Sequence, residues 1–251
     1  LTQPFTFGDW LAQDGICPQS MKGGTDDTFI RAAYYYNALE IAAKSAKVLG
    51  LEADEKHYSN IKNEIKGAIQ NEYFTVTGRL ALDTQASYIL ALKFDLGPDK
   101  DKTISGFKDR LRRDLYKIKC GFVGAPLMIR TMLDCGLIEE AFRILFSCEY
   151  PGWLYEVLLG ATTVWERWNS LLPDGKISGT MMNSLNHYAY GSVAEAVYSY
   201  IGGLSPADIA WKKAFIHPIP SRFVTESSMK FDSPIGEYCC DWFVKGNEFC
   251  I

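Results

Sequence analysis

Apolar residues recur at helical spacing along most of the chain from Asp26 to Gly203, and glycines and prolines interrupt the pattern. Short connections between consecutive segments favour antiparallel neighbours. Several segments are apolar on more than one face, which is typical of helices packed between layers. We therefore expect a mainly α protein in which helical hairpins form a ring. The predicted helices cover residues 26–49, 54–72, 84–94, 102–117, 125–134 and 138–147, a stretch from near 152, and residues 193–202.

The pattern changes after Gly203, where prolines become frequent. Phe215-Ile216-His217 is a short strand candidate, and residues 235–244 and 248–251 form a predicted hairpin around Lys245-Gly246-Asn247. A single hairpin is not stable by itself. We therefore divide the chain into a helical part, residues 1–204, and the start of an all-β domain, residues 205–251.

Composition narrows the classes of function. The 251 residues carry a net charge of −4, which gives no electrostatic case for binding nucleic acid or an anionic membrane surface. There is no run of about 18 apolar residues that would cross a bilayer. The seven cysteines are an odd number in a chain that is not small, so we predict free thiols in a reducing compartment and a cytoplasmic location. They include no C-x-x-C pair that would suggest zinc, and we expect neither a metal nor a cofactor.

Aromatic residues are abundant, with 14 Tyr, 14 Phe and 6 Trp, and they concentrate around one carboxylate. Glu166 follows Trp165 and precedes Arg167 and Trp168. Indole rings exclude water and offer flat apolar faces, while a neighbouring guanidinium favours an ionised carboxylate. This combination suits a general base in a sugar-binding cleft. The alternative is a structural pair between Glu166 and Arg167 within a packed aromatic cluster.

A second polar and aromatic stretch covers residues 182–192 and contains His187. Ser192 and Glu195 have the spacing of a capping box, which predicts a helix that begins near Val193. His187 would then lie in the loop before that helix, where ligand contacts are common. The alternative is a structural histidine whose hydrogen bonds are satisfied within the fold.

Together these two stretches resemble a known family. A-T-T-V-W-E-R-W at residues 161–168 and M-N-S-L-N-H-Y-A-Y-G at residues 182–191 are similar to the catalytic domain of bacterial-type α-L-rhamnosidases. Shorter similarities extend over nearly the whole chain: F-G-D-W-L at 7–11, G-F-V-G at 121–124, Y-P-G-W-L-Y at 150–155, and D-S-P-I-G at 232–236 with Trp242.

The resemblance implies a fold and an activity. The fold would be a six-hairpin α/α barrel, incomplete in this chain, followed by the start of a β-sandwich. The activity would be hydrolysis of terminal α-L-rhamnose from a rhamnose-containing glycoside with inversion at the anomeric carbon. Glu166 matches the general base and His187 a residue that hydrogen-bonds the sugar. Trp10 matches an aromatic wall of the −1 pocket, and three further indoles lie near enough to shape it: Trp153, Trp165 and Trp168.

An inverting glycosidase also needs a protonated carboxyl group, roughly 6.5–9.5 Å from the base. In the family this general acid lies in an Asp- and Arg-rich segment before the G-D-W piece. We find no such segment in the sequence and expect it upstream of Leu1. The chain alone would then hold the base half of the site.

Three other functions compete with this one. A glucoamylase- or trehalase-like α/α-barrel glycosidase would also pair carboxylates in an aromatic cleft. A prenyltransferase or terpene cyclase is disfavoured, because Asp26-Asp27 lacks the third Asp of a metal-binding cluster. A sugar-binding remnant without catalysis would retain the pocket and lose turnover.

Overall fold

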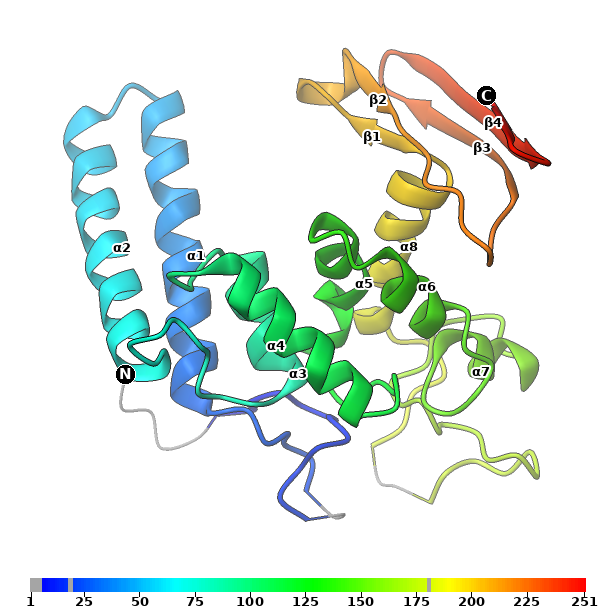
Figure 1. Cartoon of the computed structure of the whole chain (residues 1–251), viewed down its shortest axis with the longest axis horizontal. Coiled ribbons are helices and arrows are strands. Elements are labelled where there is room, and N and C mark those ends of the chain that lie inside the picture. The colour runs from blue at the N-terminus through cyan, green and yellow to red at the C-terminus, as the bar shows by residue number, and fades with distance from the viewer. Residues whose placement is uncertain (1–5, 18–19, 180–181) are drawn as a thin grey trace. The chain divides into compact units, whose positions relative to one another are not determined.

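The computed structural model describes residues 6–17, 20–179 and 182–251. The chain forms two compact units, residues 1–131 and residues 132–251. Helices dominate, and short antiparallel strands occupy the last part of the chain (Figure 1). The mainly α fold expected from the helical periodicity is confirmed, while the domain border expected at residue 204 stays a prediction.

The first unit begins with an antiparallel hairpin of two long helices, α1 (Asp27–Val48) and α2 (Glu52–Tyr73) (Figure 1). The Asp26 carboxylate caps α1 by accepting a hydrogen bond from the Phe29 amide at 2.8 Å. Gly50 has a φ of 72°, and this left-handed conformation lets the chain reverse between the helices. An ion pair between Lys62 Nζ and Glu40 Oε2, 2.6 Å apart, joins the two helices.

The second pair consists of α3 (Gln85–Lys93) and α4 (Lys100–Arg113). Helix α3 is buried over nearly its whole length, including its polar residues Gln85 and Ser87. The predicted end of α4 at residue 117 is wrong. Leu115 and Tyr116 have φ values of 53° and 58°, so the chain leaves the helix in a left-handed conformation that bulky side chains seldom adopt.

Three shorter helices follow: α5 (Ala125–Asp134), α6 (Ile138–Leu145) and α7 (Trp153–Leu158). Residues 159–179 and 182–188 form turns and bends, with an isolated bridge between Leu171 and Ile177. The next helical stretch comprises a 3₁₀ turn at Ala189–Ser192, α8 (Val193–Ala196) and a π turn at Val197–Ile201. The predicted capping box at Ser192 is wrong, because the helical turns already begin at residue 189. The Ser192 hydroxyl instead donates to the Ala189 carbonyl oxygen at 3.3 Å.

Two small antiparallel sheets complete the second unit. β1 (Leu204–Pro206) pairs with β2 (Ala214–Ile216), and a second sheet has the order β3-β4-β5, with bounds Glu226–Ser233, Gly236–Lys245 and Glu248–Cys250. The predicted hairpin is confirmed as β4 and β5. Strand β3 was not predicted, because its sequence E-S-S-M-K-F-D-S is dominated by polar residues. Its alternating burial shows that it is a half-buried strand all the same.

The core beside this sheet contains Leu204, Cys240 and Trp242. Trp242 Nε1 donates to the Ile201 carbonyl oxygen at 2.7 Å, which ties β4 to the end of the preceding helical stretch. Cys239 is exposed and Cys240 is buried, because neighbouring side chains on a strand point to opposite faces of the sheet. All seven cysteines are free thiols in the structure.

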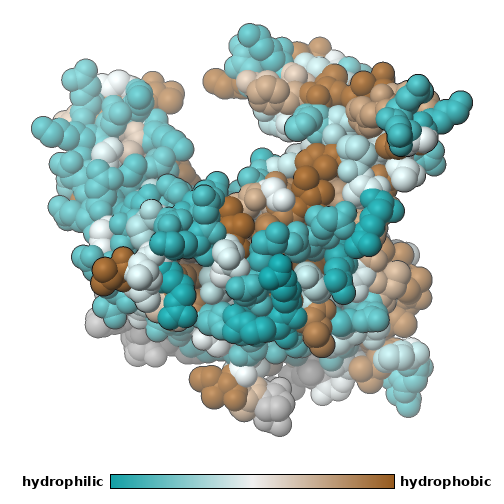
Figure 2. Space-filling view, in the orientation of Figure 1, coloured by the Kyte–Doolittle hydropathy of each residue, from teal (hydrophilic) through white to brown (hydrophobic). Residues whose placement is uncertain are grey.

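Hydrophilic residues cover the visible faces of α2 and α4 (Figure 2). Among the described helices, none combines the length and the apolar character that a bilayer crossing requires.

Candidate active site

The structure places the two polar and aromatic stretches of the second unit beside each other. The His187 amide donates to the Val164 carbonyl oxygen at 2.8 Å, and the Glu166 amide donates to the Ser184 carbonyl oxygen at 2.9 Å. These bonds resemble a short length of antiparallel pairing. They fix the main chain at Val164 and Glu166 against the segment that carries His187.

Side chains reinforce this pairing. Arg167 Nε donates to the Met182 carbonyl oxygen at 2.8 Å, and Asn183 Nδ2 donates to the Ser170 carbonyl oxygen at 3.0 Å. The Arg167 guanidinium therefore binds the main chain of the opposite loop.

The Glu166 residue is 7% exposed and lies between two buried indole-bearing residues, Trp165 and Trp168. Trp168 stacks on the Tyr190 ring with centroids 4.0 Å apart and meets Trp153 edge-on at 5.1 Å. Trp153 Nε1 donates to the Tyr190 carbonyl oxygen at 3.0 Å. These rings exclude water and hold the backbone around Glu166. Their direct contact with a sugar stays a prediction.

His187 is half-buried, and its ring orientation is fixed. Nδ1 accepts a hydrogen bond from the Ala189 amide at 3.3 Å, so the neutral ring carries its proton on Nε2. The ring stacks on Tyr188 with centroids 5.2 Å apart, and Tyr188 is 88% exposed. The arrangement gives His187 one nitrogen suited to donate a hydrogen bond to a hydroxyl group.

Sequence analysis did not single out Glu156, a second carboxyl group in this unit. It lies on α7, and the residue is 3% exposed. Its Oε2 atom accepts a hydrogen bond from the Trp165 amide at 3.3 Å. Burial raises the pKa of Glu156 to about 8. The signal was present in the sequence, because Glu156 is a lone acid within the apolar run W-L-Y-E-V-L-L.

Trp10 belongs to the first unit and is partly exposed, with Phe7 edge-on to its ring at 5.6 Å. The Phe122 amide donates to the Trp10 carbonyl oxygen at 2.8 Å. The neighbouring Asp9 is fully buried and accepts hydrogen bonds from three amides, those of Gly121, Val123 and Gly124. The G-D-W and G-F-V-G segments therefore lie together, and the role of Trp10 in a sugar pocket stays a prediction.

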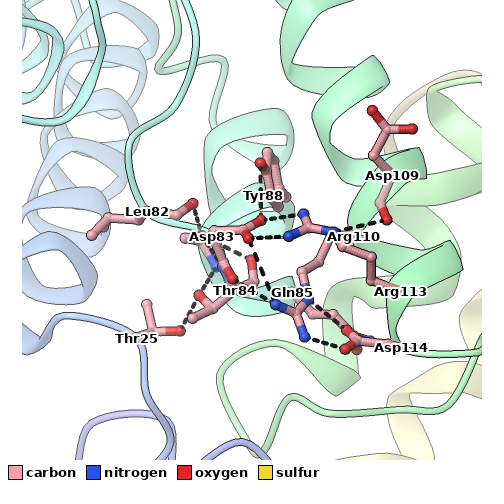
Figure 3. Close-up of polar contacts among 11 residues, drawn as sticks. Thr25, Leu82, Asp83, Thr84, Gln85, Tyr88, Asp109, Arg110, Arg113 and Asp114 are labelled. Carbon is pink, nitrogen blue, oxygen red and sulfur yellow. Dashed lines mark hydrogen bonds and ion pairs between the residues drawn. The ribbon is translucent and has the colours of Figure 1, made fainter.

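Gln85, Arg110 and Asp114 belong to a polar network of the first unit (Figure 3). Gln85 Nε2 donates to Asp114 Oδ2 at 2.7 Å and to the Lys117 carbonyl oxygen at 2.8 Å. Gln85 Oε1 accepts from the Lys119 amide at 2.9 Å. Arg110 also pairs with the buried Asp114. The Gln85 side chain, on the buried helix α3, therefore holds loop residues 114–119 in place.

No group of three or more His, Cys, Asp or Glu side chains close enough to hold a metal ion occurs in the described ranges.

Comparison with known proteins gives consistent matches. Residues 2–201 match the bacterial alpha-L-rhamnosidase 6 hairpin glycosidase domain, and residues 203–251 match the bacterial alpha-L-rhamnosidase C-terminal domain. An alpha-L-rhamnosidase of Formosa agariphila is 34% identical over 249 residues, which cover 96% of this chain and 26% of the relative.

Two solved structures are also similar. The Streptomyces avermitilis α-L-rhamnosidase complexed with L-rhamnose has a TM-score of 0.89 and 31% identity, over 99% of this chain and 23% of that one. The native Aspergillus terreus enzyme has a TM-score of 0.89 and 31% identity, over 96% and 28%. The chain spans about a quarter of the length of the curated relatives it matches. By its family matches and its fold, the chain belongs to the bacterial α-L-rhamnosidase family, with the 6-hairpin glycosidase domain followed by the family's C-terminal domain.

Proposed function

We propose that the protein removes terminal α-L-rhamnose from rhamnosides with inversion, and that Glu166 is the general base. The observation that supports this most is the setting of Glu166. Glu166 is buried beside two buried tryptophans in the chain, Trp165 and Trp168, and main-chain bonds hold it beside the segment that carries His187. Relatives named α-L-rhamnosidase match nearly the whole chain, which favours this substrate class over the α-glucosides of other α/α-barrel enzymes.

In this mechanism Glu166 accepts a proton from a water molecule as the water oxygen attacks the anomeric carbon. The glycosidic bond breaks, and the leaving oxygen takes a proton from the general acid. His187 donates a hydrogen bond from Nε2 to a rhamnose hydroxyl and orients the ring. We assign the general base and leave the general acid unassigned. No carboxyl group of the described residues is established at the acid–base distance of an inverting enzyme, on the opposite side of the sugar from Glu166.

The test is hydrolysis of p-nitrophenyl α-L-rhamnoside by the protein and by Glu166→Gln. We expect Gln to keep the shape and the binding of rhamnose and to reduce turnover by at least about 10³-fold, because an amide cannot accept the proton. Glu226→Gln is the control, since Glu226 is exposed on β3. NMR of the first product formed should show the anomer opposite to that of the substrate.

Three other outcomes of these assays would change the proposed base, the substrate class or the activity itself. Near-normal turnover by Glu166→Gln would refute the assignment of the base. Release from an aryl α-glucoside with none from the rhamnoside would replace the substrate class. Rhamnose binding by the wild-type protein without any turnover would identify a sugar-binding protein.

A further inference from the structure

The carboxyl group of Glu156 touches the main chain immediately before the proposed base. Oε2 accepts the hydrogen bond from the amide of Trp165, the residue that precedes Glu166. On its other side, the Glu166 amide is bound to the Ser184 carbonyl oxygen. The two bonds therefore fix consecutive amides, one through a side chain on α7 and one through the opposite loop.

The second oxygen of this carboxyl group, Oε1, is buried and has no hydrogen-bond partner in the described part of the chain. A buried ionised carboxylate needs water, a cation or several hydrogen-bond donors, and the Glu156 carboxyl group receives one hydrogen bond, from the Trp165 amide. Burial accordingly raises the pKa of Glu156 to about 8, so the group is protonated at neutral pH. An uncharged acid accepts one hydrogen bond much as an amide side chain does.

We infer that Glu156 is a positioning residue, which acts as a buried hydrogen-bond acceptor from α7 and holds the Trp165–Glu166 main chain in place for catalysis. The inference rests on the proposed function of Glu166. We do not assign Glu156 as the general acid, because its Oε2 atom is engaged by the Trp165 amide and the residue is 3% exposed. Its role is exerted through the placement of Glu166.

The two informative variants are Glu156→Gln and Glu156→Leu. Gln keeps an acceptor for the Trp165 amide and stays uncharged at every pH. Leu keeps the approximate volume and the burial but leaves the amide without an acceptor. A buried unpaired amide shifts a local equilibrium by about tenfold. We expect Leu to lower kcat on the aryl rhamnoside by about tenfold or more with a smaller change in KM, and Gln to retain kcat within about twofold.

Amide hydrogen exchange gives a readout that does not depend on activity. In Glu156→Leu the Trp165 amide should exchange about tenfold faster, while the His187 amide, bonded to Val164, should keep its protection as the internal control. Glu156→Gln should protect both amides as the wild-type protein does.

The outcomes separate this inference from the proposed function. Full activity and an unchanged Trp165 exchange rate in Glu156→Leu would overturn the inference. A Glu156→Gln variant as inactive as Glu156→Leu would also overturn it, because that result would show that catalysis requires the carboxyl group itself. Absence of rhamnosidase activity in the wild-type protein would overturn the proposed function and with it the catalytic consequence. The exchange rate of Trp165 would still decide whether Glu156 holds that amide.

Discussion

Asp9 makes the stability of the first unit depend on pH in an unusual direction. Its carboxyl group is completely buried, and burial raises its pKa from 3.8 to about 6, although three amides favour the ionised form. Asp14 adds repulsion that acts in the same direction as burial. The folded state therefore binds a proton more tightly than the unfolded state, so folding is favoured at low pH.

The magnitude follows from the two pKa values. The contribution is fully present below about pH 3.8 and is lost as the pH rises through about 6. The interval is about two pH units, and at about 1.36 kcal/mol per unit it corresponds to about 3 kcal/mol of opening free energy. Exchange protection of the amides bonded to Asp9 should consequently fall by about a hundredfold between pH 4 and pH 7.5.

Hydrogen exchange over residues 119–125, corrected for the intrinsic pH dependence of exchange, measures this directly. Asp9→Asn is the control, because the amide side chain cannot ionise and Asp14 is unchanged. Its protection should be lower at pH 4, since one acceptor is lost, and should vary much less with pH. Protection that instead increases with pH in the wild-type protein would show that the three amides outweigh burial, and would refute the reasoning.

Further variants test the other contacts. Gly121→Ala should destabilise the first unit by about 2 kcal/mol or more in urea unfolding, because the added Cβ would lie 2.0 Å from the Trp10 carbonyl oxygen. Gly67→Ala is its control, since that Cβ meets nothing within 4 Å, and it should stabilise α2 by about 0.5–1 kcal/mol. Gln85→Leu should destabilise by about 1–3 kcal/mol, and a change in melting temperature near zero would argue against its role in the loop. His187→Ala should weaken rhamnose binding, measured by calorimetry, by about tenfold, whereas lower stability with unchanged binding would assign it a structural role.

The helices were largely predictable, because caps and periodic apolar residues act locally. Asp26 and Thr84 cap α1 and α3 within one turn of the helix start. The errors arose where the backbone or distant partners decide the structure. Leu115 adopts a left-handed conformation that its side chain disfavours, and β3 is a strand because β4 pairs with it.

Glu166 and His187 could be recognised in the sequence as candidate site residues. The contacts that bring their two segments together could not be predicted from it. The bonds that join their segments run between main-chain atoms, and such bonds leave no residue pattern in the sequence. Glu156 binds the Trp165 amide, which lies beyond the end of its own helix, and Asp9 binds the Gly121 amide, which lies far along the chain. A lone acid within an apolar run was the available signal, and only the fold shows which amide it binds.

The hydrogen bonds of Asp9 also bear on the order in which the chain assembles. Its partners lie 112 to 115 positions away, whereas Glu166 and Ser184 are separated by about twenty. Closing the longer loop costs about 1.5 kcal/mol more in chain entropy. Residues 7–11 are synthesised more than a hundred residues before their partners, so this segment, with Trp10, is made early and fixed late, while the surroundings of Glu166 can form soon after they leave the ribosome.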